Sequence, residues 1–170
     1  MTFTIRPAQL TDLPQLLLLA EEARALLKAR HIDQWQDGYP SEAVLRADIA
    51  RQAGYVLADG PAVLGYFALT FGTDETYARI ENGRWTTPEP YGVLHRVMVS
   101  QQLRGQHAAQ HIFDFWHQQT KSKNLTALRA DTHPDNSPMQ HLFLKNGFAP
   151  CGTIFVRNGQ ARTAFEKNIR

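Results

Sequence analysis

The chain has 170 residues, 43% of them hydrophobic and 20% charged, a balance typical of a soluble globular protein with one sizeable core. Its 18 basic and 16 acidic residues nearly cancel and form no run that would follow a nucleic-acid backbone, so we expect no nucleic-acid partner. The longest apolar run, residues 16–20, is too short to span a membrane. A single cysteine, Cys151, excludes an intrachain disulfide, and no secretory pattern opens the sequence, so we expect a cytoplasmic protein.

Hydrophobic periodicity and turn residues divide the chain into alternating strands and helices. In chain order we expect a strand at 3–7, helices at 11–30 and 41–53, two strands within 55–71, a loop at 72–90, a strand at 91–99, a helix at 104–121, a strand at 125–132, a helix at 137–146 and a hairpin within 148–168. Thr11 and Ser41 are the expected N-caps of the first two helices, while Gly54 and Gly147 are the expected stops of the second and fourth.

The order of these elements predicts a mixed α/β fold in one domain, residues 1–170. Two strand–helix–strand passages within residues 91–155 require right-handed crossovers and a locally parallel arrangement. The loop at 72–90 is long for a compact domain, and such loops are usually functional or mobile.

The stretch from Tyr91 to Trp116 reads as a strand, a turn and a helix. The first amides of a helix lack internal partners and carry the positive end of its dipole, so they can hold a phosphate. Gly105 and the small Ala108 allow close approach, and Arg104 adds a fixed positive charge. By local pattern alone, an ordinary amphipathic helix explains the stretch equally well. It is neither a P-loop nor a dinucleotide fingerprint, because it lacks their lysine and spaced glycines.

Two motifs together resemble the GNAT superfamily, the acetyl-CoA-dependent N-acetyltransferases. The phosphate loop of that family reads Arg/Gln-x-x-Gly-x-Gly/Ala, and here the loop is Arg104-Gly105-Gln106-His107-Ala108-Ala109. Its first and last positions match, whereas His107 replaces the middle glycine. The later motif, Asn-x-x-Ala-x-x-Leu-Tyr-x-x-x-Gly-Phe, is matched here at Asn136, Leu142, Gly147 and Phe148 and departs at Met139 and Phe143. The chain also resembles a bacterial branch containing "PYGVLHRVMVS" and "DTHPDNSPMQ".

This resemblance implies a GNAT fold, a V-splayed mixed central sheet with helices on both faces, that binds acetyl-CoA as co-substrate. The pantetheine arm would pair with the backbone of the strand at 91–99, as an added strand does. The diphosphate would lie on residues 104–110, and one face of the helix at 137–146 would look toward the thioester. The residues expected to contact acetyl-CoA are Val97, Met98, Val99, Arg104, Gly105, Gln106, His107, Ala108, Ala109, Gln110, Asn136 and Phe143.

The expected chemistry is direct attack of an amine on the bound thioester, because no nucleophile–histidine pair is evident in the sequence. His95 is the expected general base, since histidine titrates near working pH and some relatives, the arylalkylamine acetyltransferases, carry histidine on this strand. The alternative is that His95 is a structural histidine. His133 is the second candidate for the base, although it can equally fix a turn. Asp131 would orient a neighbour or cap that turn.

Phe143 stands where the family often has a tyrosine that protonates the departing thiolate. A thiol with a pKa of about 8.5 can leave without that acid. Loss of catalysis with retained acyl-CoA binding is the alternative. His107 and His111 have the spacing of a zinc pair, but the metalloprotease pattern needs a glutamate where Ala108 stands, so we expect no metal.

The expected acceptor is a small-molecule primary amine, with a protein or peptide N-terminus as the alternative. By resemblance, the aromatic residues Trp35, Tyr39 and Trp85 border the acceptor pocket, although surface packing would explain them equally well. No membrane partner is expected, and a homodimer is compatible with the sequence.

Overall fold

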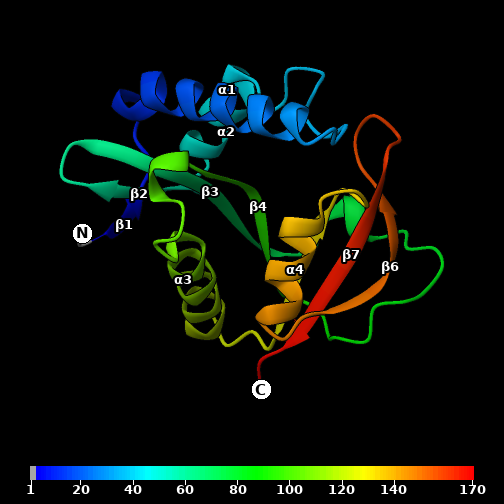
Figure 1. Cartoon of the computed structure of the whole chain (residues 1–170). Coiled ribbons are helices and arrows are strands. Elements are labelled where there is room, and N and C mark those ends of the chain that lie inside the picture. The colour runs from blue at the N-terminus through cyan, green and yellow to red at the C-terminus, as the bar shows by residue number, and fades with distance from the viewer. Residues whose placement is uncertain (1–2) are drawn as a thin grey trace. The chain divides into compact units, whose positions relative to one another are not determined.

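A computed structural model describes residues 3–170. The strands are β1 (Thr4–Pro7), β2 (Gly54–Asp59), β3 (Ala62–Gly72), β4 (Tyr91–Val99), β5 (Ala127–Thr132), β6 (Ala149–Phe155) and β7 (Ala161–Asn168). The helices are α1 (Leu13–Ala29), α2 (Glu42–Ala50), α3 (Ala108–Ser122) and α4 (Ser137–Lys145), and short 3₁₀ turns are η1 (Leu10–Asp12), η2 (Glu75–Tyr77) and η3 (Gln101–Leu103). The predicted element order and the mixed α/β class are confirmed (Figure 1).

Contacts along the chain separate it into two compact units. The first contains the residues up to Leu69 together with Leu94–Phe115, and the second contains Thr70–Val93 together with Trp116–Arg170. The hydrogen-bonded strand order is β1-β2-β3-β4 in the first unit and β4-β5-β7-β6 in the second, because β4 runs through both.

The strand directions confirm that the first of the two expected strand–helix–strand units has neighbouring parallel strands. β4 and β5 pair in parallel, with Gly92 opposite Leu128. β5 and β6 are both antiparallel to β7, so they run in the same direction, but β7 lies between them. The second strand–helix–strand passage therefore does not produce a neighbouring parallel pair.

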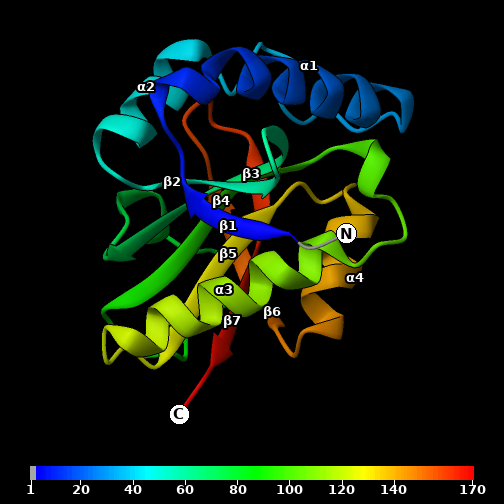
Figure 2. The same cartoon turned by 90° about the vertical axis from the view of Figure 1, so that its left-hand side faces the viewer.

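In the first unit, helices cover both faces of the sheet. α1 and α2 pack on one face through a core that includes Leu16, Leu45 and Tyr66, all fully buried. Leu57 belongs to the opposite face because side chains alternate along β2, and it packs there with Ala108 at the start of α3. Figure 2 shows α1 above and α3 below the strands of this unit.

In the second unit, aromatic rings join helices to strands on one face. Phe143 of α4 stacks on Phe165 of β7 with ring centroids 4.9 Å apart, and Trp116 of α3 stacks on Phe148 at 5.2 Å. Ala164 precedes Phe165 and faces the other way, where it packs with a core contributed partly by the loop that precedes β4.

Several expected helix ends are confirmed and others are wrong. Ser41 caps α2 by accepting a hydrogen bond from the Val44 amide, and Gly147 adopts a φ of +81° after α4. Thr11 is not a cap, because a 3₁₀ turn precedes α1 and ends at its N-cap, Asp12. Gly54 opens β2 and does not stop α2, which ends at Ala50 before a left-handed residue.

The third helix also begins later than expected. α3 starts at Ala108, and residues 104–107, which we expected in its first turn, form a turn after η3 that contains Gly105 and His107. Both of those residues have positive φ, +77° and +56°, which a helix does not accommodate.

Candidate functional site

The segment between β4 and α3 borders a pocket of about 350 Å³ in the first unit. The opposite side of this pocket is formed by the last turns of α1, with Leu26 and Arg30. Six of the residues predicted to contact acetyl-CoA line it together, namely Val99, Arg104, Gly105, His107, Ala108 and Ala109. These predicted residues therefore lie together on one side of a single cavity.

The chemistry of this pocket suits an anion. Within residues 3–170, no protein group accepts a hydrogen bond from the backbone amides of Gly105, His107, Ala108 or Ala109. These amides lie at the start of α3, where the helix dipole favours negative charge. The exposed guanidinium groups of Arg104 and Arg30 add positive charge to the same cavity. A diphosphate fits this donor set because it can satisfy several amides and both cations.

The loop that carries these amides is anchored to α1. The Glu22 carboxylate accepts hydrogen bonds from the Gln101 amide at 2.6 Å and from the Ser100 hydroxyl at 3.4 Å. The Ser100 amide in turn donates to the Leu64 carbonyl of β3 at 2.8 Å. The start of η3 is therefore fixed before any ligand is present.

Sequence analysis missed Glu22 and Arg30 as contributors to this site. Glu22, Leu26 and Arg30 follow one another at a spacing of four residues, so they lie on one face of α1. That periodicity is visible in the sequence, but nothing local indicates that this face borders a loop some 80 residues later.

Strand β4 carries the predicted catalytic residue. Arg96 adopts a φ of +53° in the middle of the strand, a left-handed conformation that is uncommon for a residue other than glycine. His95 and Val97, on either side of it, are half-buried, whereas the Met98 side chain lies in the core beneath α1 and α2. Any contact of Met98 with a ligand would therefore come from its backbone.

A buried network connects Arg96 to α2 and to the loop before it. The Asp48 carboxylate, which has no exposed surface, accepts hydrogen bonds from Arg96 Nε at 2.8 Å and Nη2 at 2.7 Å. The Tyr66 hydroxyl donates to the same carboxylate at 2.7 Å. Burial, reinforced by the Asp48 charge, raises the pKa of Tyr66 well above its usual value, so this hydroxyl stays protonated.

Trp35 and Tyr39 lie in an ordered loop between α1 and α2. Their ring centroids are 6.0 Å apart, and Trp35 also packs against the core beneath α1. The Tyr39 hydroxyl accepts a hydrogen bond from Arg96 Nη1 at 2.8 Å. Arg24 of α1 further secures this loop by donating to the Pro40 carbonyl.

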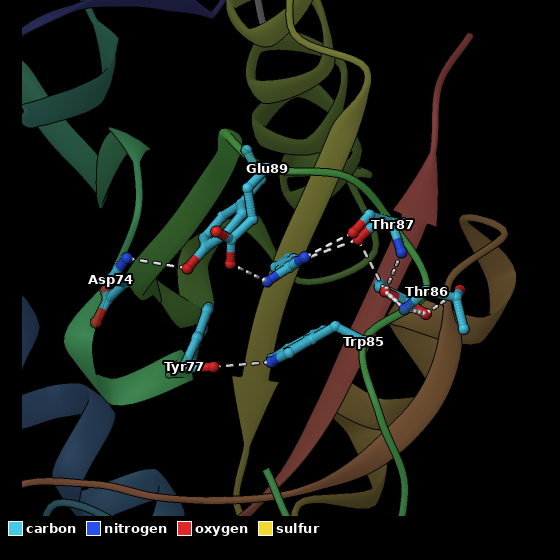
Figure 3. Close-up of polar contacts among 9 residues, drawn as sticks. Asp74, Tyr77, Trp85, Thr86, Thr87 and Glu89 are labelled. Carbon is cyan, nitrogen blue, oxygen red and sulfur yellow. Dashed lines mark hydrogen bonds and ion pairs between the residues drawn. The ribbon is translucent and has the colours of Figure 1, made fainter. Parts of the chain in front are cut away.

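Trp85 lies in the loop before β4, in the second unit, where its indole points toward Tyr77 (Figure 3), and it takes part in a network centred on Arg129. Its indole nitrogen donates to the Tyr77 carbonyl at 2.9 Å, and the Arg129 guanidinium lies over its ring at 4.5 Å. Arg129 also donates to the Thr87 carbonyl at 2.7 Å. Trp85 thus has a packing role in this loop, which is held by side-chain hydrogen bonds.

Glu166 of β7 holds the same loop from its other side. Its carboxylate accepts hydrogen bonds from the amides of Thr86 and Thr87, each at 3.0 Å, and from both of their hydroxyls. Burial tends to raise the pKa of Glu166, but these hydrogen bonds outweigh it and hold that pKa below its usual value.

The remaining candidates lie around α4, in the second unit. Asn136 is the N-cap of this helix, and its side-chain oxygen accepts from the Met139 amide at 3.3 Å. Phe143 is buried in the aromatic cluster with Phe148 and Phe165. His133 Nδ1 accepts from the Asp135 amide at 3.0 Å, which fits a role in the turn. Asp131 accepts from the Tyr77 hydroxyl at 2.7 Å, so it orients a neighbour.

The structure also bears on two other chemistries. Burial raises the pKa of the Cys151 thiol to about 12, so this thiol is a poor nucleophile at neutral pH. Among residues 3–170, no three His, Cys, Asp or Glu side chains are grouped so that they could hold a metal ion. None of the helices in that part of the chain is long and apolar enough to cross a membrane.

Comparison with known proteins connects this geometry to a family. A model of the acetyltransferase (GNAT) family matches residues 20–148. A GNAT-family acetyltransferase from Streptococcus agalactiae 2603 is 32% identical over 99% of this chain and 96% of its own, with a TM-score of 0.87. A structure from Staphylococcus aureus MU50 is 28% identical over 98% of this chain and 99% of its own, with a TM-score of 0.75.

A more distant structure is that of the PaiA N-acetyltransferase from Thermoplasma acidophilum in complex with coenzyme A. It is 18% identical over 99% of both chains with a TM-score of 0.73, so the likeness shows a common fold alone. No curated protein matches the chain.

Proposed function

The chain belongs to the GNAT acetyltransferase family, and we propose that it moves an acetyl group from acetyl-CoA to a primary amine of a small molecule. In this proposal residues 1–170 act as one N-acetyltransferase domain, and both substrates are bound together when the reaction occurs.

The pocket between α1 and the start of α3 is the observation that carries the proposal. It combines backbone amides without protein acceptors with two guanidinium groups, those of Arg30 and Arg104. This is the chemistry that a diphosphate requires. We assign the diphosphate of acetyl-CoA to this pocket, and the pantetheine arm to the backbone of Val97, Met98 and Val99.

The reaction needs no covalent enzyme intermediate. The neutral amine nitrogen attacks the thioester carbonyl carbon, the C–S bond breaks as the C–N bond forms, and coenzyme A leaves as a thiolate. We assign the amine proton to His95, directly or through water, and the backbone amide of Val97 to the developing oxyanion. Holding both reactants together can contribute on the order of 7–11 kcal/mol at most.

Two residues of this chain bear on how the transfer occurs. Cys151 is poorly suited to carry the acetyl group because its pKa is raised to about 12. Phe143 has no proton to give to the departing thiolate, so water would supply it. A thiol of ordinary pKa, about 8.5, leaves tolerably in this way.

The test has two measurements on the purified chain. Calorimetric titration with acetyl-CoA measures binding, and a thiol-release assay measures transfer to polyamines, amino sugars, aromatic amines, amino acids and peptides. We expect binding, with thiol release for one class of small amine. Release with peptides alone would indicate a protein acetyltransferase, and binding without release would indicate a non-catalytic acyl-CoA module.

A charge reversal in the pocket tests the assignment of the diphosphate. Arg104→Glu places a negative charge beside the proposed diphosphate, and we expect acetyl-CoA affinity to fall by about 100-fold or more. Arg84→Glu makes the same change at an exposed arginine that does not line the pocket, and it should leave affinity within about twofold. Unchanged affinity in Arg104→Glu would remove the diphosphate from this loop.

A further inference from the structure

We propose that Arg96 is a positioning residue for the acceptor amine. Held by the buried carboxylate of Asp48, it fixes Tyr39 relative to the distorted part of β4 that carries His95 and Val97. The inference rests on the proposed function, because it names a device that would place the amine acceptor and leave the diphosphate pocket unaffected.

The first step of the argument is the backbone of Arg96. A left-handed residue in the middle of a strand is strained and persists only where its surroundings impose it. Here the surroundings are two parallel hydrogen bonds from Nε and Nη2 to Asp48, at 2.8 and 2.7 Å. In a regular strand His95 and Val97 would share one face, so the φ of +53° at Arg96 between them alters how the two are directed relative to each other, and the ion pair holds that geometry.

The second step is the rigidity of Asp48. Besides Arg96, its two oxygens accept hydrogen bonds from the Tyr66 hydroxyl at 2.7 Å and from Arg51 at 3.1 Å. The side chain of Asp48 has no exposed surface, and that of Arg96 is 12% exposed. A buried pair of this kind is weak evidence for stability, because apolar residues can often replace it, but it does define a single geometry.

The third step is the remaining branch of the guanidinium. Nη1 of Arg96 donates to the Tyr39 hydroxyl at 2.8 Å, and the Tyr39 ring lies beside Trp35. One planar group therefore connects α2, β4 and the loop that carries both aromatic candidates for acceptor contact. Lysine cannot make these three directed contacts at once, because its ammonium is a point charge without the planar fork.

This arrangement predicts that changes in the network affect the amine and acetyl-CoA differently. None of Asp48, Arg96 or Tyr39 lines the pocket at the start of α3, so a change in any of them should leave the proposed diphosphate site intact. A change confined to the Tyr39 hydroxyl should displace the loop that carries Trp35 and Tyr39, the proposed acceptor loop, and raise the KM for the amine without weakening acetyl-CoA binding. A change at Arg96 should also disturb the β4 distortion, which lowers kcat.

The experiment uses the amine identified by thiol release and three variants. Tyr39→Phe removes the hydroxyl that accepts from Arg96, and we expect a rise of about fivefold in amine KM, the value of one hydrogen bond. Arg96→Lys should lower kcat/KM for the amine by about 10- to 100-fold, because two or more directed contacts are lost. The dissociation constant of acetyl-CoA should stay within about twofold of the wild type in Tyr39→Phe. In Arg96→Lys it should change less than kcat/KM for the amine does, because only the strand assigned to the pantetheine arm is disturbed and the proposed diphosphate site is intact.

Arg6→Lys is the matched control. Arg6 makes an equally short bidentate pair with Asp12 in the same unit, with both distances 2.8 Å, but it has no contact with the acceptor loop among the described residues. It should change neither kinetic constant.

The outcomes separate the inference from the proposed function. A wild-type chain that does not bind acetyl-CoA or release thiol overturns the proposed function. An active wild type with unchanged amine kinetics in both Tyr39→Phe and Arg96→Lys overturns the positioning role, as does an equal loss of affinity for both substrates. If Arg96→Lys does not fold, Tyr39→Phe still decides, because it leaves the Asp48–Arg96 pair intact.

Discussion

The turn before α3 allows a prediction whose sign depends on one backbone angle. His107 has a φ of +56°, in the left-handed region, at the position where the family motif has glycine. Histidine tolerates this region better than most residues, but it does not do so freely. We therefore expect His107→Gly to be more stable than His107→Ala, the reverse of the order found inside a helix.

The magnitude follows from two opposing terms. A left-handed conformation costs a non-glycine residue about 1–2 kcal/mol, and glycine escapes that cost. Glycine loses more backbone entropy on folding, which costs about 0.5–1 kcal/mol relative to alanine. His107 is exposed, so the loss of its side chain changes the free energy of unfolding only slightly, and by the same amount in both variants. The difference should favour glycine by about 0.5–1 kcal/mol.

Thermal unfolding, followed by fluorescence and circular dichroism together, measures this difference. A chain of this length should show a midpoint temperature higher by roughly 1–4 °C in His107→Gly than in His107→Ala. His111 is the matched control, because it is exposed inside α3, where His111→Gly should be less stable than His111→Ala by about 1 kcal/mol. If glycine is the less stable residue at both positions, the left-handed turn is refuted, whatever the loop binds.

Two further predictions concern titratable groups. His95→Ala should lower turnover most at low pH, where a base matters most to a protonated amine; pH–rate profiles check this, and an equal loss at every pH would indicate a structural role. Glu166→Gln should lower the free energy of unfolding at neutral pH by about 1.5–3 kcal/mol, because it removes a charged acceptor that serves four donor groups. The folded-state pKa of Glu166 is depressed, so its contribution is complete above the unfolded pKa of about 4.3 and is lost as pH falls through the folded one. Urea unfolding between pH 7 and pH 3 should therefore show the two proteins converging in acid, and a constant difference would contradict this.

The sequence predicted the parts of the fold that local chemistry decides. Tyr91–Val99 was predicted as a strand to the residue, because an apolar stretch ends there at polar turn residues. The sequence predicted two strands within 55–71 and a hairpin within 148–168, and Gly60 and Gly159, which lie at the two turns, have the positive φ that such turns need. The segment predicted to bind a phosphate was recognised from its own residues, and Arg104, Gly105, His107, Ala108 and Ala109 of that segment line one pocket; its ligand stays a prediction.

Contacts between residues distant in sequence could not be predicted in this way. Asp48 looks like an ordinary polar residue of an amphipathic helix, and Arg96 looks like a charge in a strand. Only the fold brings them within 2.7 Å of each other. The helix ends failed for a related reason, because the Asp12 carboxylate is held by Arg6 and its own turn, which moves the start of α1 past Thr11. In these cases a tertiary contact overrides the local signal.

Residues other than glycine with a left-handed backbone show where tertiary contacts override the local conformational preference. Three of those among residues 3–170, His31, Gln52 and Asn124, directly follow helices, where such a conformation commonly ends a helix. Asn82 belongs to a residue type that tolerates it.

The others are Trp35, Arg96 and His107. Trp35 and Arg96 have no such local explanation and must be imposed by their surroundings, and His107 tolerates the conformation better than most residues but not freely. The three fall in the loop between α1 and α2, in β4 beside His95, and in the segment before α3, for each of which the sequence independently predicted a function. Unfavourable backbone conformations persist where the surrounding structure over-determines them, and they cluster at sites of binding and catalysis. Backbone angles and sequence motifs are separate observations, so their coincidence at these three segments is an argument for the site that neither makes alone.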